Sequence, residues 1–153
     1  VVPLAREVEY AKGYLTIQKM RYKDKLEFEI DVEPSILNIP LIKLVLQPII
    51  ENAIYHGLKY KESKGLLQVK GFMKDGNAVL QVIDNGVGMD EETLSHIYDK
   101  HKVNYHSNGV GVYNVQKRLK LYYGENYGIT YESEKGVGTT ATIIIPGIQE
   151  ESI

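Results

Sequence analysis

Asp84 is the residue whose setting points most directly to chemistry. It ends the apolar run VLQVI at residues 79–83, and the sequence NGVGM follows it. Asn-Gly after an alternating strand is also a strong β-hairpin signal, so a plain turn is the competing interpretation. The next residues read DEETL, which is typical of a helix start rather than of a returning strand. An acid held at a strand end beside two glycines suggests a binding loop.

A second polar group falls on a predicted helix, residues 40–58. Asn52 and His56 are four residues apart, so their side chains lie on one side of that helix, next to an apolar stripe that we expect to face the core. The stripe comprises Leu46, Ile50, Ala53 and Gly57. Pro48 lies inside this predicted helix and removes one backbone hydrogen bond, so a kink there would have a local cause.

Paired glycines mark three loops, at residues 86–88, 109–111 and 136–138. A single pair is weak evidence, because glycine permits close approach to a ligand and is equally common in turns. Three such loops together with a polar helix face form a more specific combination.

Taken in order, these segments resemble the conserved boxes of sensor histidine kinases. The sequence QPIIENAIYHG (47–57) resembles their N box, DNGVGM (84–89) their first glycine box and NGVGVYNV (108–115), followed by Arg118-Leu119, the second. GVGTT (136–140) is similar to their last glycine-threonine element, and the opening helix resembles the connector of the YesM/LytS-type subfamily. The resemblance implies the GHKL (Bergerat) fold, a two-layer α/β sandwich that binds ATP.

The resemblance also implies roles for individual residues. Asp84 would accept a hydrogen bond from the adenine amino group, which guanine cannot offer. Asn52 would bind Mg²⁺ through its amide oxygen, with phosphates and water completing the shell. The implied ATP-binding set is Asn52, Lys59, Asp84, Gly86, Gly88, Met89, Gly109, Val110, Gly111, Val112 and Thr139, with Glu51 and His56 as catalytic candidates.

Several of these positions have an ordinary structural alternative. Lys59 could be a solvated loop charge, and Glu51 a surface acid of the helix. Arg118 could bind phosphate or stabilise a helix end. Gly109 and Gly111 are expected to precede a helix over residues 113–123, whose free amide groups favour anions. Residues 89–108 would form a lid, and a metal cluster of Asp99, His101 and His106 is disfavoured against a polar loop.

Two departures from the family pattern bear on the activity. Related ATPases of the gyrase, Hsp90 and MutL types carry a glutamate base four residues before the Asn, where this chain has Pro48. That difference favours phosphoryl transfer over water activation. Tyr55 replaces a residue that is often basic, which keeps a non-catalytic nucleotide-binding module or a GHKL-type ATPase open as alternatives.

The phosphoaccepting histidine of the family, found in a His-Phe context, does not occur here, since the histidines are 56, 96, 101 and 106. We therefore expect residues 1–23 to be a connector helix, 24–148 the catalytic domain and 149–153 a frayed tail. The expected partners are ATP, the dimerisation domain of a homodimeric parent and a response regulator. The parent is expected in the plasma membrane, with this domain in the cytoplasm.

Hydrophobic periodicity places the remaining elements. Apolar-acidic alternation predicts a strand over residues 26–32, and hairpins are expected over 66–83 and 127–145, with a short helix over 91–100 between them. Hairpins imply a mixed, mostly antiparallel sheet, and the helices are expected to cover one face of it.

Composition is consistent with one domain. The chain has 153 residues, a net charge of −2 and no cysteine, which excludes disulfides and cysteine nucleophiles. The mixed charges indicate no nucleic-acid partner, and no apolar run is long enough for direct membrane contact by a spanning helix.

Overall fold

The protein is built on a five-stranded mixed sheet, seen in a computed structural model that describes residues 1–58, 63–97 and 109–148. The strand order is β2-β4-β5-β7-β6. The strands are β2 (Leu26–Val32), β4 (Gly65–Lys74), β5 (Asn77–Asp84), β6 (Gly128–Glu134) and β7 (Gly138–Pro146). Only the β2–β4 pair is parallel; β4–β5, β5–β7 and β6–β7 are antiparallel. The predicted mixed, mostly antiparallel sheet is thus confirmed.

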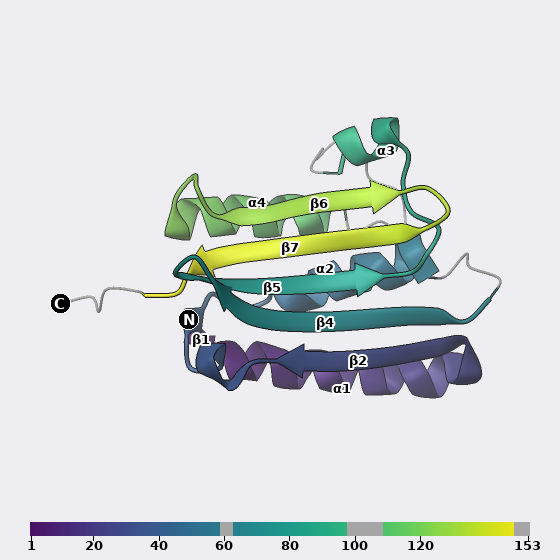
Figure 1. Cartoon of the computed structure of the whole chain (residues 1–153), viewed down its shortest axis with the longest axis horizontal. Coiled ribbons are helices and arrows are strands. Elements are labelled where there is room, and N and C mark those ends of the chain that lie inside the picture. The colour runs from purple at the N-terminus through teal and green to yellow at the C-terminus, as the bar shows by residue number, and fades with distance from the viewer. Residues whose placement is uncertain (59–62, 98–108, 149–153) are drawn as a thin grey trace.

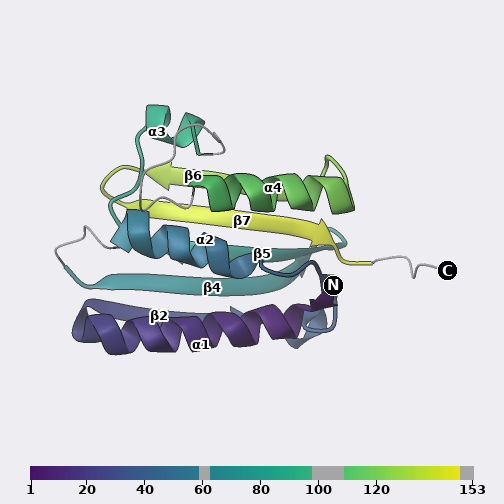
Figure 2. The same ribbon diagram turned by 180° about the vertical axis from the view of Figure 1, so that it is seen from behind.

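Three helices cover one face of this sheet, as Figures 1 and 2 show from its two sides. They are α1 (Leu4–Tyr22), α2 (Leu46–Asn52), which continues as a π-helix over Ala53–Leu58, and α4 (Gly109–Tyr123). The short helix α3 (Glu91–Ser95) lies beside one end of the sheet. The two-layer sandwich expected from the sequence is therefore the fold.

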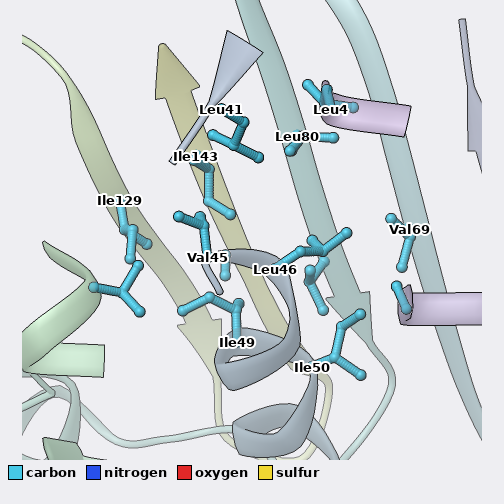
Figure 3. Packing of buried hydrophobic residues seen from close by; sticks show 14 of the residues in the cluster. Leu4, Leu41, Val45, Leu46, Ile49, Ile50, Val69, Leu80, Ile129 and Ile143 are labelled. Atoms are coloured by element: carbon cyan, nitrogen blue, oxygen red, sulfur yellow. The ribbon is translucent and has the colours of Figure 1, made fainter. Parts of the chain in front are cut away.

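The core lies between the helices and the sheet. Leu46, Ile49 and Ile50 of α2 are at most 1% exposed and pack with buried side chains of α1, β5 and β7 (Figure 3). Alternation decides which strand residues take part, because successive side chains point to opposite faces. In β5, for example, Ala78, Leu80 and Val82 are buried against the helices.

The second helix begins later than the sequence predicted. Pro40–Leu41 form a short strand, β3, which pairs antiparallel with β1 (Val2–Pro3). Helix α2 starts at Leu46, so Pro48 lies in its first turn. Amide groups there have no intrahelical acceptor, and a proline removes nothing that the helix uses. Pro48 therefore breaks no hydrogen bond of the helix, and the local cause for a kink is removed. Pro3 precedes α1 as its cap residue.

The helix expected from residue 113 was also placed too late. Helix α4 already begins at Gly109, so Gly109 and Gly111 form its first turn instead of a preceding loop. Short 3-10 turns at Lys23–Lys25 and Pro34–Ile36, absent from the prediction, flank β2. The end of the predicted helix at 91–100, the cluster of Asp99, His101 and His106, most of the predicted lid and the frayed tail lie outside the described residues.

Candidate functional site

A pocket opens between the π-helix and the ends of β5, β6 and β7. The hollow spans about 340 Å³ with the adjoining open solvent included, and only about 20 Å³ of it admits the centre of a water molecule. Its lining comprises Ile49, Asn52, Ala53, His56, Gly57, Val82, Asp84, Gly88, Met89, Tyr131, Thr139 and Ala141. The walls are mostly apolar, with a few polar side chains, which is the usual composition of a small-molecule site.

Asp84 is the buried acid of this pocket. It is the last residue of β5, pairs with Thr139 of β7, and is only 6% exposed. The amide of Gly86 donates a hydrogen bond of 2.9 Å to its Oδ1. Burial raises the pKa of this carboxyl from 3.8 to about 6, while backbone hydrogen bonds from Gly86 and Thr139 lower it. A buried acceptor at a strand end is a selective partner for a ligand N–H group.

Gly57 lets the π-helix approach Asp84. A Cβ atom on Gly57 would lie 2.6 Å from Asp84 Oδ1, and one on Gly86 would lie 2.2 Å from the Gly57 carbonyl oxygen. The Val87 amide donates to that same carbonyl at 3.0 Å. The absence of both Cβ atoms therefore lets the loop after β5 close against the helix.

Gly88 and Gly138 fasten this loop to the β6–β7 turn. Gly88 has a φ of +68°, and a Cβ there would lie 2.0 Å from the Glu134 carbonyl oxygen. A Cβ on Gly138, whose φ is +147°, would lie 2.1 Å from the Asp84 carbonyl oxygen. Both glycines thus serve close backbone packing. Of the two glycines of the loop after β5, Gly88 lines the pocket, whereas Gly86 is not among its lining residues and packs on Gly57.

Thr139 and Met89 share a partner in Ser133. The Ser133 hydroxyl lies 2.7 Å from Thr139 Oγ1, and it accepts a 2.8 Å hydrogen bond from the Met89 amide. Thr139 and Met89, both in the predicted ATP-binding set, line the pocket and are joined by a serine that the sequence analysis overlooked. Its signal in the sequence is weak, because Ser133 stands between Glu132 and Glu134 in a polar run that ends β6.

Asn52 and His56 both line the pocket, from the last residue of α2 and from the π-helix. Asn52 is 6% exposed. Burial lowers the pKa of the His56 imidazole, which keeps it neutral near pH 7. Asn52 offers an amide oxygen suited to Mg²⁺. Among the described residues there is no cluster of three or more His, Cys, Asp or Glu side chains that could hold a metal alone.

Glu51 points away from this lining. Gln47 Nε2 donates a 3.0 Å hydrogen bond to Glu51 Oε1. The pKa of Tyr14 on α1 is raised to about 12, first by burial and then by the charge of Glu51 and by Tyr55. Glu51 therefore lies on the side of α2 that faces α1, outside the pocket lining.

The second glycine box occupies the start of α4. The backbone of Gly109, Val110 and Gly111 forms the first turn of this helix. Val112 is fully buried in the core, so its side chain belongs to packing. Lys59 lies outside the described residues.

Arg118 has a partner that neither sequence interpretation considered. Its guanidinium donates to the carbonyl oxygens of Lys43 and Leu44, in the segment that leads into α2.

Apart from Met89, the sequence analysis did not assign the apolar lining residues to the site. Gly57 was assigned to the core stripe, and Val82, Tyr131 and Ala141 to ordinary strand positions. Val82 and Ala141 are register partners in the sheet. These strand residues could be assigned to the pocket only once the strand order was known. Alternating apolar residues look the same in the sequence whether they line the core or the pocket.

Comparisons with known proteins agree with this geometry. Residues 38–149 match the family described as "Histidine kinase-, DNA gyrase B-, and HSP90-like ATPase". The sensor histidine kinase YesM of Bacillus subtilis is 31% identical over 146 residues, which is 95% of this chain and 24% of YesM. The sensor protein LytS of Oceanobacillus iheyensis is 35% identical over 128 residues, covering 82% of this chain and 22% of LytS. The chain thus spans about a quarter of these relatives.

Solved structures show the same fold. The catalytic domain of the histidine kinase ThkA, in a nucleotide-free form, superposes with a TM-score of 0.69 at 17% identity, covering 94% of this chain and 92% of that domain. The histidine kinase domain of the blue-light activated kinase of Erythrobacter litoralis superposes with a TM-score of 0.68 at 18% identity, covering 95% of this chain and 62% of that one.

The chain therefore belongs to the histidine kinase-, DNA gyrase B- and HSP90-like ATPase family. Within that family it is the ATP-binding catalytic domain of a sensor histidine kinase, with relatives of the YesM/LytS type. None of the described helices is long and apolar enough to cross a membrane.

Proposed function

We propose that this domain binds Mg·ATP in the pocket described above and transfers its γ-phosphoryl group to a histidine on a separate dimerisation domain. The observation that carries the proposal is the buried carboxylate of Asp84 at the end of an otherwise mostly apolar pocket. Backbone amides of Gly86 and Thr139 already donate to this carboxylate, and its remaining lone pairs can accept a further N–H group from a ligand. The exocyclic amino group of adenine is such a donor, and the apolar walls suit the faces of the base.

Asn52, His56 and the first turn of α4 are proposed to bind the triphosphate and its metal ion. Asn52 supplies one amide oxygen for Mg²⁺, and the ion keeps water and phosphate oxygens as its other ligands. The first turn of α4 presents free backbone amides and the positive end of a helix dipole to phosphates. His56, Lys59 and the backbone at Gly109 and Gly111 complete the proposed phosphate contacts.

In the transfer step, the bond between the γ-phosphorus and the bridging oxygen breaks as an imidazole nitrogen bonds to that phosphorus. ADP leaves, and the imidazole gives up its N–H proton to water. Mg²⁺, when bound, would neutralise charge on the phosphates. The protein contributes mainly positioning and electrostatics. Glu51 lies on the side of α2 that faces α1, so it is proposed to contact the histidine-bearing partner from outside the pocket rather than the phosphates. Pro48 occupies the place of the water-activating glutamate of related ATPases, which favours transfer over hydrolysis.

The remaining assignments complete this proposal. Residues 1–23 connect to a dimerisation domain and also pack on the core, and residues 24–148 form the catalytic domain that holds the proposed nucleotide site. The parent is a homodimeric plasma-membrane sensor that passes the phosphoryl group to a response regulator, and this domain faces the cytoplasm.

The test of nucleotide binding is a thermal melt with and without ligand. Mg·ATP or ADP at one hundred times Kd should stabilise the wild-type chain by about 2.7 kcal/mol. Asp84→Asn should abolish the shift, because the acceptor that faces the adenine amino group becomes partly a donor. Asp75→Asn, the same change in the exposed β4–β5 turn, should keep it. A wild-type chain with no shift at millimolar nucleotide contradicts the proposal.

Transfer itself needs a second measurement. A histidine-bearing dimerisation domain added in trans should acquire acid-labile phosphate in the presence of Mg·ATP. Nucleotide binding without transfer would instead favour a non-catalytic binding module, and steady phosphate release without phosphoprotein would favour an ATPase.

A further inference from the structure

Helix α2 is capped by a side chain from another helix. Glu7, in the first turn of α1, is only 4% exposed and accepts hydrogen bonds from three backbone amides of the segment that enters α2. These amides belong to Leu44 (3.3 Å), Val45 (2.8 Å) and Leu46 (3.2 Å). The cap residue Val45 makes no side-chain cap hydrogen bond. A carboxylate at a helix N-terminus is favourable because it faces unpaired amides and the positive end of the dipole.

Helix α4 also contacts this segment, through hydrogen bonds to two of the segment's backbone carbonyl groups. The Arg118 guanidinium donates to the carbonyls of Lys43 and Leu44. Leu44 has a φ of +58°, a conformation that costs a non-glycine residue free energy. Its amide is bonded to Glu7 and its carbonyl to Arg118, so side chains from α1 and α4 together hold this residue in place.

Tyr123, at the end of α4, adds a third attachment. Its hydroxyl accepts a hydrogen bond from the Ile42 amide and donates one to the Pro40 carbonyl, each at 3.3 Å. Residues 40–46 are therefore bonded by one side chain of α1 and two of α4.

The two helices attached to this segment carry the two polar ends of the proposed site. Asn52 lies six residues after Leu46 at the other end of α2, about 9 Å along the axis at the usual rise per residue. Gly109 begins α4 nine residues before Arg118. A regular helix bends little over about two to four turns. The attachments at the start of α2 and in the second half of α4 therefore also restrict the position of Asn52 relative to the first turn of α4.

We propose that residues 40–46 form a joint that sets the distance between the magnesium ligand Asn52 and the phosphate-binding turn of α4, with Glu7 and Arg118 as positioning residues. Through Glu7 the joint also ties this distance to the position of α1. The inference rests on the proposed function, which assigns Mg²⁺ to Asn52 and phosphates to α4.

The test compares three ligands on this chain by titration calorimetry: adenosine, ADP without Mg²⁺, and ADP with Mg²⁺. In Glu7→Gln, the amide nitrogen can no longer accept, so the joint loosens. We expect the Mg²⁺ enhancement, the ratio of the two Kd values for ADP, to fall at least threefold. Adenosine affinity should fall less than the Mg²⁺ enhancement, because Asp84 belongs to β5 and is held by the Gly86 amide, although Ile49 and Gly57 of the attached helix also line the pocket. Arg118→Lys, which loses the two-pronged contact, should act in the same direction.

Glu9→Gln and Arg6→Lys, both exposed on α1, serve as matched controls and should leave the ratio unchanged. If Glu7→Gln does not fold, the half-exposed Arg118 carries the test. An unchanged ratio in folded variants overturns the inference, and so does an equal loss of affinity for all three ligands. A wild-type chain that binds none of the ligands overturns the proposed function instead, and the inference with it.

Discussion

The carboxylate of Asp84 is buried, so its negative charge lowers the free energy of unfolding of the ligand-free chain. Burial raises the pKa of Asp84 from 3.8 to about 6. Since the folded-state pKa lies above the unfolded value, the folded state binds the proton more tightly. Ionisation of Asp84 therefore reduces the free energy of unfolding as pH rises from about 4 through 6.

We predict that Asp84→Asn stabilises the ligand-free chain at pH 7 by about 1–3 kcal/mol, from a shift of about two pKa units at 1.36 kcal/mol each. The asparagine retains an oxygen to accept the Gly86 amide and cannot ionise. The gain should shrink as pH falls from 6 to 4. Urea unfolding across that range measures it, with Asp75→Asn as the exposed control. A gain independent of pH would remove ionisation as its cause.

Gly57 packs directly against Asp84, so a side chain at this position should affect both stability and nucleotide binding. In Gly57→Ala the new methyl group would overlap Asp84 Oδ1, at 2.6 Å. We predict a loss of about 1–3 kcal/mol in stability together with at least a tenfold loss of nucleotide affinity.

The matched control is Gly13→Ala, on the exposed side of α1, where a Cβ meets nothing within 4 Å. It should instead stabilise the chain by about 0.5–1 kcal/mol, because alanine loses less conformational entropy on folding. Denaturant unfolding measures the stability of both variants, and ADP titration measures their nucleotide affinity. Retained ADP affinity in Gly57→Ala would show that Asp84 can shift without harm.

At the scale of elements, the sequence specified the strands better than the helix starts. Strands follow from alternation and turn residues, and β2 was predicted within its observed bounds. Helix α2 was extended back to Pro40 because proline at a helix start is common. The capping carboxylate at its actual start comes from Glu7, 39 residues away from Leu46 in the sequence, and local patterns cannot reveal such a partner.

The same shift of the helix start changes what Pro48 does. As the third residue of α2, it occupies a position whose amide has no intrahelical acceptor. We predict that Pro48→Ala changes the free energy of unfolding by less than about 1 kcal/mol, against about 3 kcal/mol for a proline in a helix interior. Urea unfolding measures this. A gain near the larger value would mean that Pro48 strains the helix.

At the scale of the whole molecule, sequence motifs located the site in broad terms but not its walls. Asp84, Asn52, His56 and Thr139 were found from motif resemblance and meet in one pocket. The apolar lining and the contacts of Arg118 depend on which strands and helices become neighbours. Those neighbours are brought together by long-range pairing, such as β5 with β7, that a local pattern does not encode.

Helix α1 was expected to be a connector outside the catalytic domain, but it packs on the core. Leu4, Ala11 and Leu15 are 0% exposed and belong to the same cluster as the residues of α2 and the sheet. A helix that only connected two domains would not need to bury these side chains. We therefore predict that residues 24–153 alone do not fold cooperatively, because they lose this packing and the Glu7 cap from a total stability of about 5–15 kcal/mol.

Point variants test the same idea without truncation. Leu15→Ala should cost about 2–5 kcal/mol, as expected for a buried leucine, whereas Ile17→Ala, at a side chain 63% exposed, should change stability by less than about 0.5 kcal/mol. Circular dichroism during urea unfolding measures both variants and the truncated chain. If the truncated chain unfolds at the wild-type midpoint and with the wild-type slope, α1 is only a connector. The joint at residues 40–46 would then have to keep α2 in place without Glu7, and phosphate binding by the truncated chain would be the direct measure of whether it does.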